Sequence, residues 1–143
     1  MMLPDVNVLL YAFRSDAAHH SRYRTWLKEM VAGPAAYGMS PQVLSGVIRV
    51  GTHPKVFAKP SRLSDTLAFA NTLLEQPNCQ IVSPGPRHWS IFTGLCRQAP
   101  ATGSLTADAW LAALAIESGC EWVTTGRDFA RFPGLRWRAP FAQ

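Results

Sequence analysis

Apolar and polar residues recur along the chain with two periodicities, and this pattern predicts the order of the secondary-structure elements. Short apolar runs bounded by turn residues indicate buried strands, whereas apolar residues spaced three or four positions apart indicate helices with one buried face. Runs of the first kind lie at 3–5, 35–39, 79–82, 122–125 and around Trp137. Helical spacing is found at 7–13, 19–30, 41–51, 64–74, 87–97 and 108–118. Strands alternating with pairs of helices predict an α/β domain with a central, mainly parallel sheet.

Helix start and stop signals support these boundaries. Ser40 followed by Pro41 is typical of an N-cap with proline at the first helical position. Ser64 is the expected N-cap of the helix at 64–74, and Gly119 is a typical C-cap for the helix that precedes it. In the helix at 87–97, the large apolar residues are expected to face the core. These are Trp89, Phe92 and Leu95.

Length and composition predict a single domain covering residues 1–143. The chain has 143 residues, of which 48% are hydrophobic, enough to bury a core of its own. No apolar run approaches the length of a membrane span, and the N-terminus lacks the basic and apolar regions of a signal peptide. We therefore expect a cytoplasmic protein that does not associate with membranes. The three cysteines are widely separated in apolar surroundings, which predicts core thiols rather than disulfides or metal ligands.

The charge balance favours a nucleic-acid partner. The net charge is +5, from 14 basic and 9 acidic residues. Most of the basic residues are arginines, which suit bidentate contact with phosphate and stacking on bases. Residues 52–62, with two lysines and a histidine, are expected to form a basic surface loop. Charge alone leaves the alternative of a basic protein without such a partner open.

Three aspartates stand where the pattern places the ends of strands or the start of a helix. Asp5 lies at the end of the first strand, Asp108 begins the helix at 108–118, and Asp128 follows the strand at 122–125. In parallel sheets, ligands bind outside the carboxyl ends of the strands. A carboxylate in a buried run needs a partner or a cation, so the three acids predict a cation site. A helix N-cap is the alternative interpretation of Asp5.

Other polar residues give weaker signals. His19 and His20 are adjacent and therefore face differently on a helix, which favours surface or capping roles over metal binding. His88, at the junction of a turn and a helix, has no visible partner in the sequence. Arg49 is either a ligand of a substrate phosphate or an ordinary solvated arginine.

Four segments in the same order resemble PIN domains, specifically the VapC-type toxins of bacterial toxin–antitoxin pairs. They are LPDVNVLLYAF, RVGTHPKVF, LTADAWLAALAIESG and TTGRDFARFPGLRW, and they extend over essentially the whole chain. The resemblance implies a three-layer fold with a central sheet flanked by helices. It further implies a metal-dependent endoribonuclease that hydrolyses RNA phosphodiester bonds, restrained by a VapB-type antitoxin and commonly a homodimer.

The resemblance also implies roles for individual residues. Asp5 corresponds to the first acid of the family and Asp108 to the acid on the late helix, so both are expected to bind Mg²⁺ or Mn²⁺ directly or through water. Asp128 matches an acid of the RDF segment and is expected to complete the negative cluster. Mg²⁺ is typically held by one or two carboxylates together with substrate phosphate, and a metal-activated water is the expected nucleophile. Asn7 and Thr106 are expected to orient ligands or water.

The sequence departs from the family at two positions. Many relatives carry a glutamate on the helix after the second strand, where Gly46 or its neighbours stand here, and Gly126 replaces a further aspartate. One metal is then held by three acids, or metal binding is weak until RNA supplies phosphate ligands. A catalytically weakened PIN-like module that binds RNA or a partner is the alternative function.

Two other α/β folds with an aspartate after the first strand fit less well. Receiver domains need a lysine late in the chain, whereas the lysines here all precede residue 60. Dehalogenase-like phosphatases need a second aspartate two residues after the first, and Asn7 occupies that position. Both alternatives are therefore disfavoured.

Overall fold

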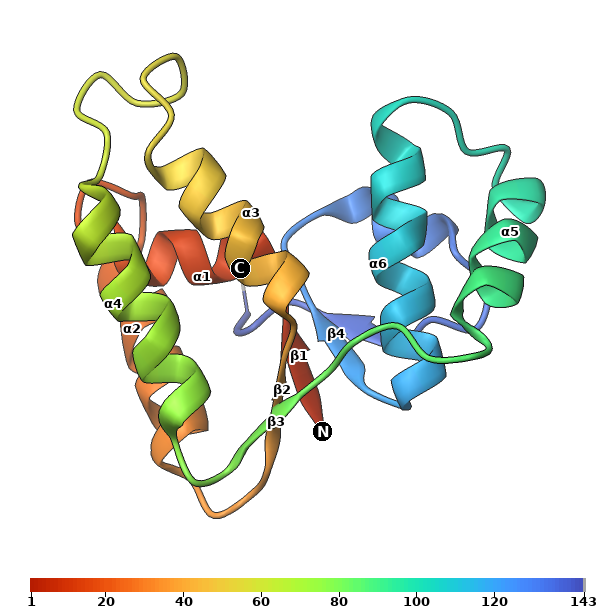
Figure 1. Ribbon diagram of the computed structural model, residues 1–143, viewed down its shortest axis with the longest axis horizontal. Coiled ribbons are helices and arrows are strands. Elements are labelled where there is room, and N and C mark those ends of the chain that lie inside the picture. The colour runs from red at the N-terminus through yellow and green to blue at the C-terminus, as the bar shows by residue number, and fades with distance from the viewer. Residues whose placement is uncertain (143) are drawn as a thin grey trace.

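The centre of the molecule is a parallel sheet (Figure 1). The computed structural model describes residues 1–142, and within them the sheet has five strands in the order β3-β2-β1-β4-β5. The strands are β1 (Met2–Pro4), β2 (Tyr37–Met39), β3 (Cys79–Ile81), β4 (Glu121–Val123) and β5 (Trp137–Arg138). The predicted α/β architecture and its succession of strands and helix pairs are confirmed.

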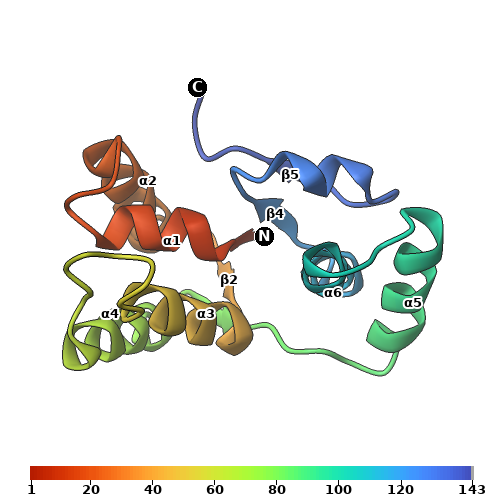
Figure 2. The same cartoon turned by 90° about the horizontal axis from the view of Figure 1, so that it is seen from above.

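Helices cover both faces of the sheet and produce three layers. The first layer consists of α1 (Val6–Phe13), α2 (His20–Ala32), α3 (Pro41–Gly51) and α4 (Leu63–Glu75). The opposite layer contains α5 (His88–Gln98) and α6 (Ser104–Ser118), as Figures 1 and 2 show. A short 3-10 helix, η1 (Arg127–Arg131), connects β4 to β5. The chain adds β2 and β3 on one side of β1 and then crosses to β4, so the strand order reverses between β1 and β4. Ligands collect at such a switch point.

The core is continuous across the sheet. Leu3, Met39, Trp122 and Val123 have no exposed surface. Helix α6 is buried on most sides because it packs against α5, β4 and η1. Its small residues allow this close approach, and four of its alanines are fully buried. They are Ala109, Ala112, Ala113 and Ala115.

Helix α4 begins two residues earlier than its sequence signal indicated, since an N-cap at Ser64 would make Asp65 the first helical residue. Its first residue is Leu63, and Arg62 occupies the cap position without a side-chain capping bond. The prediction that Ser64 is the N-cap is therefore wrong. The hydroxyl of Thr66 donates instead to the carbonyl oxygen of Leu63 at 2.8 Å.

Helix α5 differs from its prediction at two aromatic positions. Trp89 was expected in the core but is 65% exposed, because α5 packs on α6 with one face and leaves the other to solvent. His88 is buried, and its Nε2 lies 2.9 Å from the carbonyl oxygen of Trp110, so it has the partner that the sequence did not reveal.

The buried side chain of Arg14 fixes the position of the basic loop at 52–62. The guanidinium of Arg14 donates to the Ser61 hydroxyl and the Lys59 carbonyl, each at 2.9 Å, and pairs with Asp16 at 2.7 Å. It also lies 3.6 Å from the ring centroid of Phe57. A buried charge needs such complete pairing, and the pairing gives this loop a defined position.

The remaining composition-based expectations concern thiols and membranes. Cys120 is buried, Cys79 and Cys96 are half-buried, and all three are free thiols. Over residues 1–142, no helix has both the length and the apolar character needed to cross a bilayer.

Candidate active site

Asp5 stands at the end of β1, where the sheet reverses its strand order. Its side chain is at the N-terminus of α1 and accepts a hydrogen bond from the Val6 N–H at 2.6 Å through Oδ1. The N-cap interpretation of Asp5 is therefore correct as a description of local structure. The cap uses one carboxylate oxygen, while Oδ2 points to β4 and accepts a bond from the Thr124 hydroxyl at 2.6 Å.

Thr124 holds Asp5 in place from the neighbouring strand. It follows β4 directly and is fully buried. Its Oγ1 donates to Asp5 and accepts a hydrogen bond from the Gly126 N–H at 3.0 Å, so its rotamer is fixed from both sides. Sequence analysis placed Thr124 in a strand and gave it no role. The signal was a hydroxyl residue at the carboxyl end of a strand that pairs with the Asp5 strand.

Burial dominates the acidity of Asp5. The residue is 6% exposed, and this desolvation raises its pKa above the ordinary value of 3.8. The hydrogen bonds from Thr124 and Val6 act in the opposite direction without cancelling the effect. Each carboxylate oxygen accepts one bond and keeps a free lone pair. Asp5 is thus a fixed oxygen donor whose negative charge is poorly compensated.

Asp108 faces Asp5 from the opposite layer. Helix α6 begins at Ser104, four residues before the predicted start, so Asp108 lies in its second turn rather than at its beginning, and it is half-buried. Its pKa is raised by burial first, then by the negative charges of Asp5 and Asp128. These contributions indicate that Asp5 and Asp128 lie close enough to Asp108 to act on its charge. Like charges held together at a buried position favour a cation between them.

Asp128 occupies the outer rim of this group. It is in η1 with 64% of its side chain exposed, and the Nε of Arg131 lies 3.5 Å from its Oδ1. In the described part of the chain, no three side chains of His, Cys, Asp or Glu are close enough together to hold a metal ion. We therefore treat Asp5 and Asp108 as the inner pair, and Asp128 acts on Asp108 through its charge.

The other candidate residues lie on three different helices and differ in exposure. Asn7 is exposed in the first turn of α1, and Thr106 is half-buried in the first turn of α6, two residues before Asp108. Arg49 is exposed in the last turn of α3. None of the three side chains makes a hydrogen bond or ion pair within residues 1–142, so all are available to a ligand.

Gly46 explains the missing acid on α3. A Cβ at this position would lie 2.9 Å from Cγ2 of Val6, the residue immediately after Asp5. Valine has a stiff, branched side chain, so it cannot swing aside for a larger residue. Val6, the neighbour of Asp5, thus fills the space into which a larger residue at position 46 would have to extend. At Gly126, a Cβ would lie 3.3 Å from the Phe129 ring, a tight contact.

The donor set suits a hard divalent cation. The available ligands are carboxylate oxygens, which Mg²⁺ and Mn²⁺ prefer, and two of them belong to a buried pair that repels itself. Two carboxylates leave several coordination positions for water and substrate phosphate. The site can therefore bring together a cation, a phosphodiester and a water molecule.

Comparison with known proteins identifies the family of this chain. The PIN domain family model matches residues 2–135. The chain is 41% identical to ribonuclease VapC43 of Mycobacterium tuberculosis, covering 98% of this chain and 95% of that one. It is 36% identical to ribonuclease VapC33 of the same organism over the full length of both.

Solved structures with the same fold include proteins of low sequence identity. VapBC2 of Rickettsia felis, bound to a DNA fragment from its promoter, has a TM-score of 0.70 at 18% identity, covering 96% of this chain and 97% of that one. VapC20 of M. tuberculosis, a toxin that cleaves the sarcin–ricin loop, has a TM-score of 0.64 at 16% identity, covering 95% and 99%. The chain belongs to the PIN domain family, within the group of VapC ribonucleases.

Proposed function

We propose that this ribonuclease is the toxin of a type II toxin–antitoxin pair and cleaves RNA internally with the help of Mg²⁺ or Mn²⁺. The observation that carries the proposal is the pair of buried Asp5 and half-buried Asp108 at the switch point of the sheet, where each residue has a raised pKa. A bound cation neutralises the repulsion between the two carboxylates and leaves both of them ionised. We place its action in the cytoplasm, where bacterial RNA is found.

Asp5 and Asp108 would hold the cation, with Asp128 adding negative charge from the rim. A bound divalent ion at this position supplies charge neutralisation at the phosphate and lowers the pKa of a water that attacks phosphorus. Thr124 keeps Asp5 oriented. Asn7 and Thr106 orient water or phosphate beside the acids, and Arg49 contacts a flanking phosphate. The absence of a third inner carboxylate makes RNA phosphate part of the ligand set.

Cleavage of a mixed RNA pool tests this function directly. Purified protein is incubated with Mg²⁺, with Mn²⁺ and with chelator, beside an Asp5→Asn variant whose fold is checked by circular dichroism. We expect cutting only with metal and only by the wild type. Cutting that persists in chelator, or full activity in the variant, would reject the proposed mechanism.

The catalytically weakened binding module is the second candidate. The contact between Gly46 and Val6 favours it, because this contact excludes an acid that many relatives have. It predicts that the folded protein binds RNA or an antitoxin and shows no metal-dependent cleavage with either Mg²⁺ or Mn²⁺.

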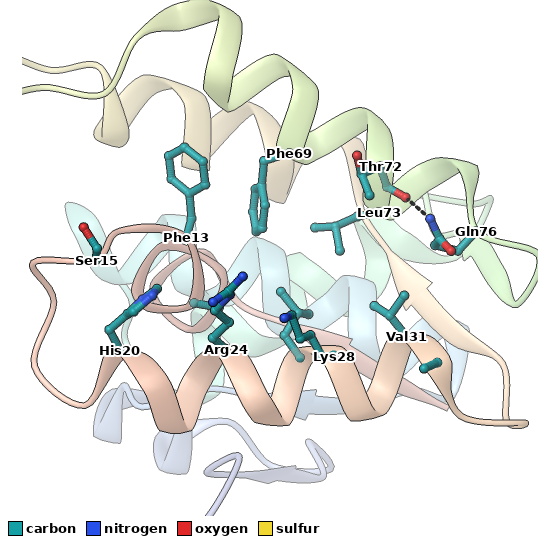
Figure 3. A pocket seen from close by; sticks show the side chains of 13 residues that line it. Phe13, Ser15, His20, Arg24, Lys28, Val31, Phe69, Thr72, Leu73 and Gln76 are labelled. Atoms are coloured by element: carbon teal, nitrogen blue, oxygen red, sulfur yellow. Dashed lines mark hydrogen bonds between the residues drawn. The ribbon is translucent and has the colours of Figure 1, made fainter.

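An apolar groove with a basic border is the surface that we assign to the antitoxin. The groove, about 800 Å³ in volume, lies between α1, α2 and α4, and none of the three aspartates lines it. Phe13, Phe69 and Leu73 contribute apolar surface, while His20, Arg24 and Lys28 follow one another along α2 (Figure 3). The lining contains no acidic residue. An amphipathic antitoxin segment with acidic residues along one edge matches this surface.

Reversing the charge of this border is expected to weaken antitoxin binding. The double variant Arg24→Glu/Lys28→Glu should lose at least about 10-fold in affinity, because two attractive contacts become repulsive. Isothermal titration with a VapB-type antitoxin that neutralises the wild type measures the change. RNA cleavage by the variant alone should stay at the wild-type level, and unchanged affinity would place the antitoxin elsewhere.

The proposal includes a homodimer. The family resemblance supports this assembly, and sedimentation of the purified chain, with and without antitoxin, measures it. A monomer at micromolar concentration would remove the homodimer from the proposal without affecting the assignment of the active site.

A further inference from the structure

The basic loop at 52–62 and the last turn of α3 carry exposed positive charge. Residues 49–62 contain two arginines and two lysines and no acidic residue. All four side chains are exposed, and none of them makes a hydrogen bond or an ion pair within residues 1–142. They are Arg49, Lys55, Lys59 and Arg62. Cations without a partner in the folded chain are available to an anionic ligand.

Two carboxylates lie near the loop and leave it positively charged. The guanidinium of Arg14 pairs with Asp16 at 2.7 Å, and this bond lowers the pKa of the Asp16 carboxyl, so the two charges neutralise each other. Asp65 is exposed in the first turn of α4 and lines a hollow together with Lys59. Against the four exposed cations, Asp65 alone of these two acids keeps an uncompensated charge.

The backbone of the loop is fixed by its own hydrogen bonds as well as by the buried guanidinium described above. The Ser61 N–H donates to the Gly51 carbonyl oxygen at 2.8 Å and closes the loop at its base. Near the tip, the N–H groups of Val56 and Phe57 both donate to the His53 carbonyl oxygen at 3.1 Å. Compact surface loops with adjacent ends are frequently functional, and an ordered loop loses little entropy when it binds a ligand.

The packing of α3 on α1 places the loop relative to Asp5. A Cβ at Gly46 would lie 2.9 Å from Cγ2 of Val6, and a Cβ at Gly51 would lie 3.5 Å from Cδ1 of Leu10. The two helices therefore run side by side in the same direction, away from Asp5, and the loop lies at the far end of α1 (Figure 1). The eight residues of α1 span roughly 12 Å. A strand that leaves the acids along α3 meets its last turn first and the loop next.

We propose that the basic loop binds the phosphate backbone of the RNA substrate a few nucleotides from the scissile bond, on one side of it. This inference rests on the proposed function, since it extends the path of the substrate away from the same site. Phosphate contacts position a nucleic acid without reading its sequence, and a lysine contacts phosphate as a flexible point charge. The antitoxin groove is a separate surface, because none of residues 52–62 lines it.

The salt dependence of RNA binding tests the loop contact. The parent is the full chain carrying Asp108→Asn, which allows binding to be measured without cleavage, and the probes are labelled single strands of adenosine or of uridine. Each lost phosphate contact should reduce the slope of log affinity against log salt by roughly 0.7. Lys55→Gln/Lys59→Gln should therefore reduce the slope by roughly 1.4 and the affinity at about 0.1 M salt by roughly 10- to 30-fold. The losses should be equal for the two probes.

Arg24→Gln/Lys28→Gln is the matched control, because it removes the same net charge from exposed positions of α2. It should leave the slope and the RNA affinity unchanged, since charges far from the strand are screened. An unchanged slope in the loop variant, an equal loss in the control, or no RNA binding by the parent would overturn the proposal. A loss of antitoxin affinity in the loop variant, with RNA binding intact, would assign the loop to a protein interface and equally overturn it.

Substrates of different length locate the contact along the RNA. A cleaved RNA is shortened one nucleotide at a time from either end, and the kinetics of the wild type and of Lys55→Gln/Lys59→Gln are compared. On long RNA the variant should raise KM roughly 10-fold with kcat nearly unchanged, as expected for binding that is equal in ground and transition states. Trimming one end alone should remove this difference. A difference that persists on the shortest substrate, or that trimming either end removes, would contradict the position of the loop.

The same measurements separate this inference from the proposed function. If the wild type cleaves RNA and the loop variant has the same KM and the same salt slope, the loop contact fails and the ribonuclease assignment stands. If no RNA is cleaved but the salt slope depends on Lys55 and Lys59, the loop contact stands and the proposed reaction fails.

Discussion

Replacing Asp108 by asparagine is expected to abolish RNA cleavage and to stabilise the metal-free protein at neutral pH. Cleavage should fall by at least roughly 1000-fold, because one of the two inner cation ligands is lost. The gain in stability follows from the raised pKa of Asp108 in the folded state. The substitution removes a carboxylate that is half-buried and repelled by Asp5 and Asp128.

The pH dependence of the stability gain has a definite sign. As pH rises from the ordinary aspartate pKa of 3.8 to the raised folded-state value, the unfolded chain releases a proton that the folded chain retains. The free energy of unfolding of the wild type therefore falls across this interval and stays lower above it. The variant lacks this loss. Solvent screening limits the difference to on the order of 1 kcal/mol, or a few degrees in Tm.

Thermal unfolding in chelator, measured from pH 3.5 to 8, tests the stability of the Asp108→Asn variant. The Tm values of the wild type and the variant should be equal at pH 3.5 and should differ increasingly as pH rises. Added Mg²⁺ should raise the Tm of the wild type only. Glu29→Gln is the control, since it removes an exposed carboxylate from α2. A variant less stable than the wild type at pH 7 would show that the acids are not in electrostatic conflict.

Replacing Thr124 by valine is expected to damage both the fold and the site. The change leaves Oδ2 of Asp5 and the Gly126 N–H without the partner they share, in a position with no exposed surface. Loss of such bonds costs about 1–3 kcal/mol of unfolding free energy. Because the Thr124 bond lowers the pKa of Asp5, its loss raises that pKa further. The acidic limb of kcat/KM should therefore move to higher pH.

Two related variants identify the source of the Thr124 effect. Thr124→Ser keeps the hydroxyl and should retain the wild-type pH profile, whereas Thr125→Val removes a hydroxyl that is only half-buried and should be nearly neutral. The measurements are kcat/KM against pH and urea unfolding. If Thr124→Val lowers stability but leaves the acidic limb in place, Thr124 supports the strand without tuning Asp5.

Periodicity predicted the architecture well because helix and strand spacing are local properties of the sequence. The succession of strands and helix pairs was visible in the chain, and parallel pairing follows from connections that contain helices. The errors occurred where tertiary contacts decide. Trp89 has the spacing of a core residue, but α5 has a neighbour on one face only.

The candidate site was predictable in composition and less so in arrangement. Asp5 and Asp108 stood out because acids are rare within apolar, buried segments. Thr124 did not, since its importance comes from strand pairing between segments more than 100 residues apart. The contact that excludes a side chain at Gly46 likewise depends on three-dimensional packing.

The contact between Gly46 and Val6 constrains how the site can change during evolution. A larger residue at position 46 meets a branched side chain next to Asp5, and a smaller residue at position 6 alone leaves a void. Either substitution alone therefore lowers the stability of the folded protein, and the second substitution restores it. The two positions form an epistatic pair, so a lineage that has adopted glycine and valine regains the third acid only by changing both together.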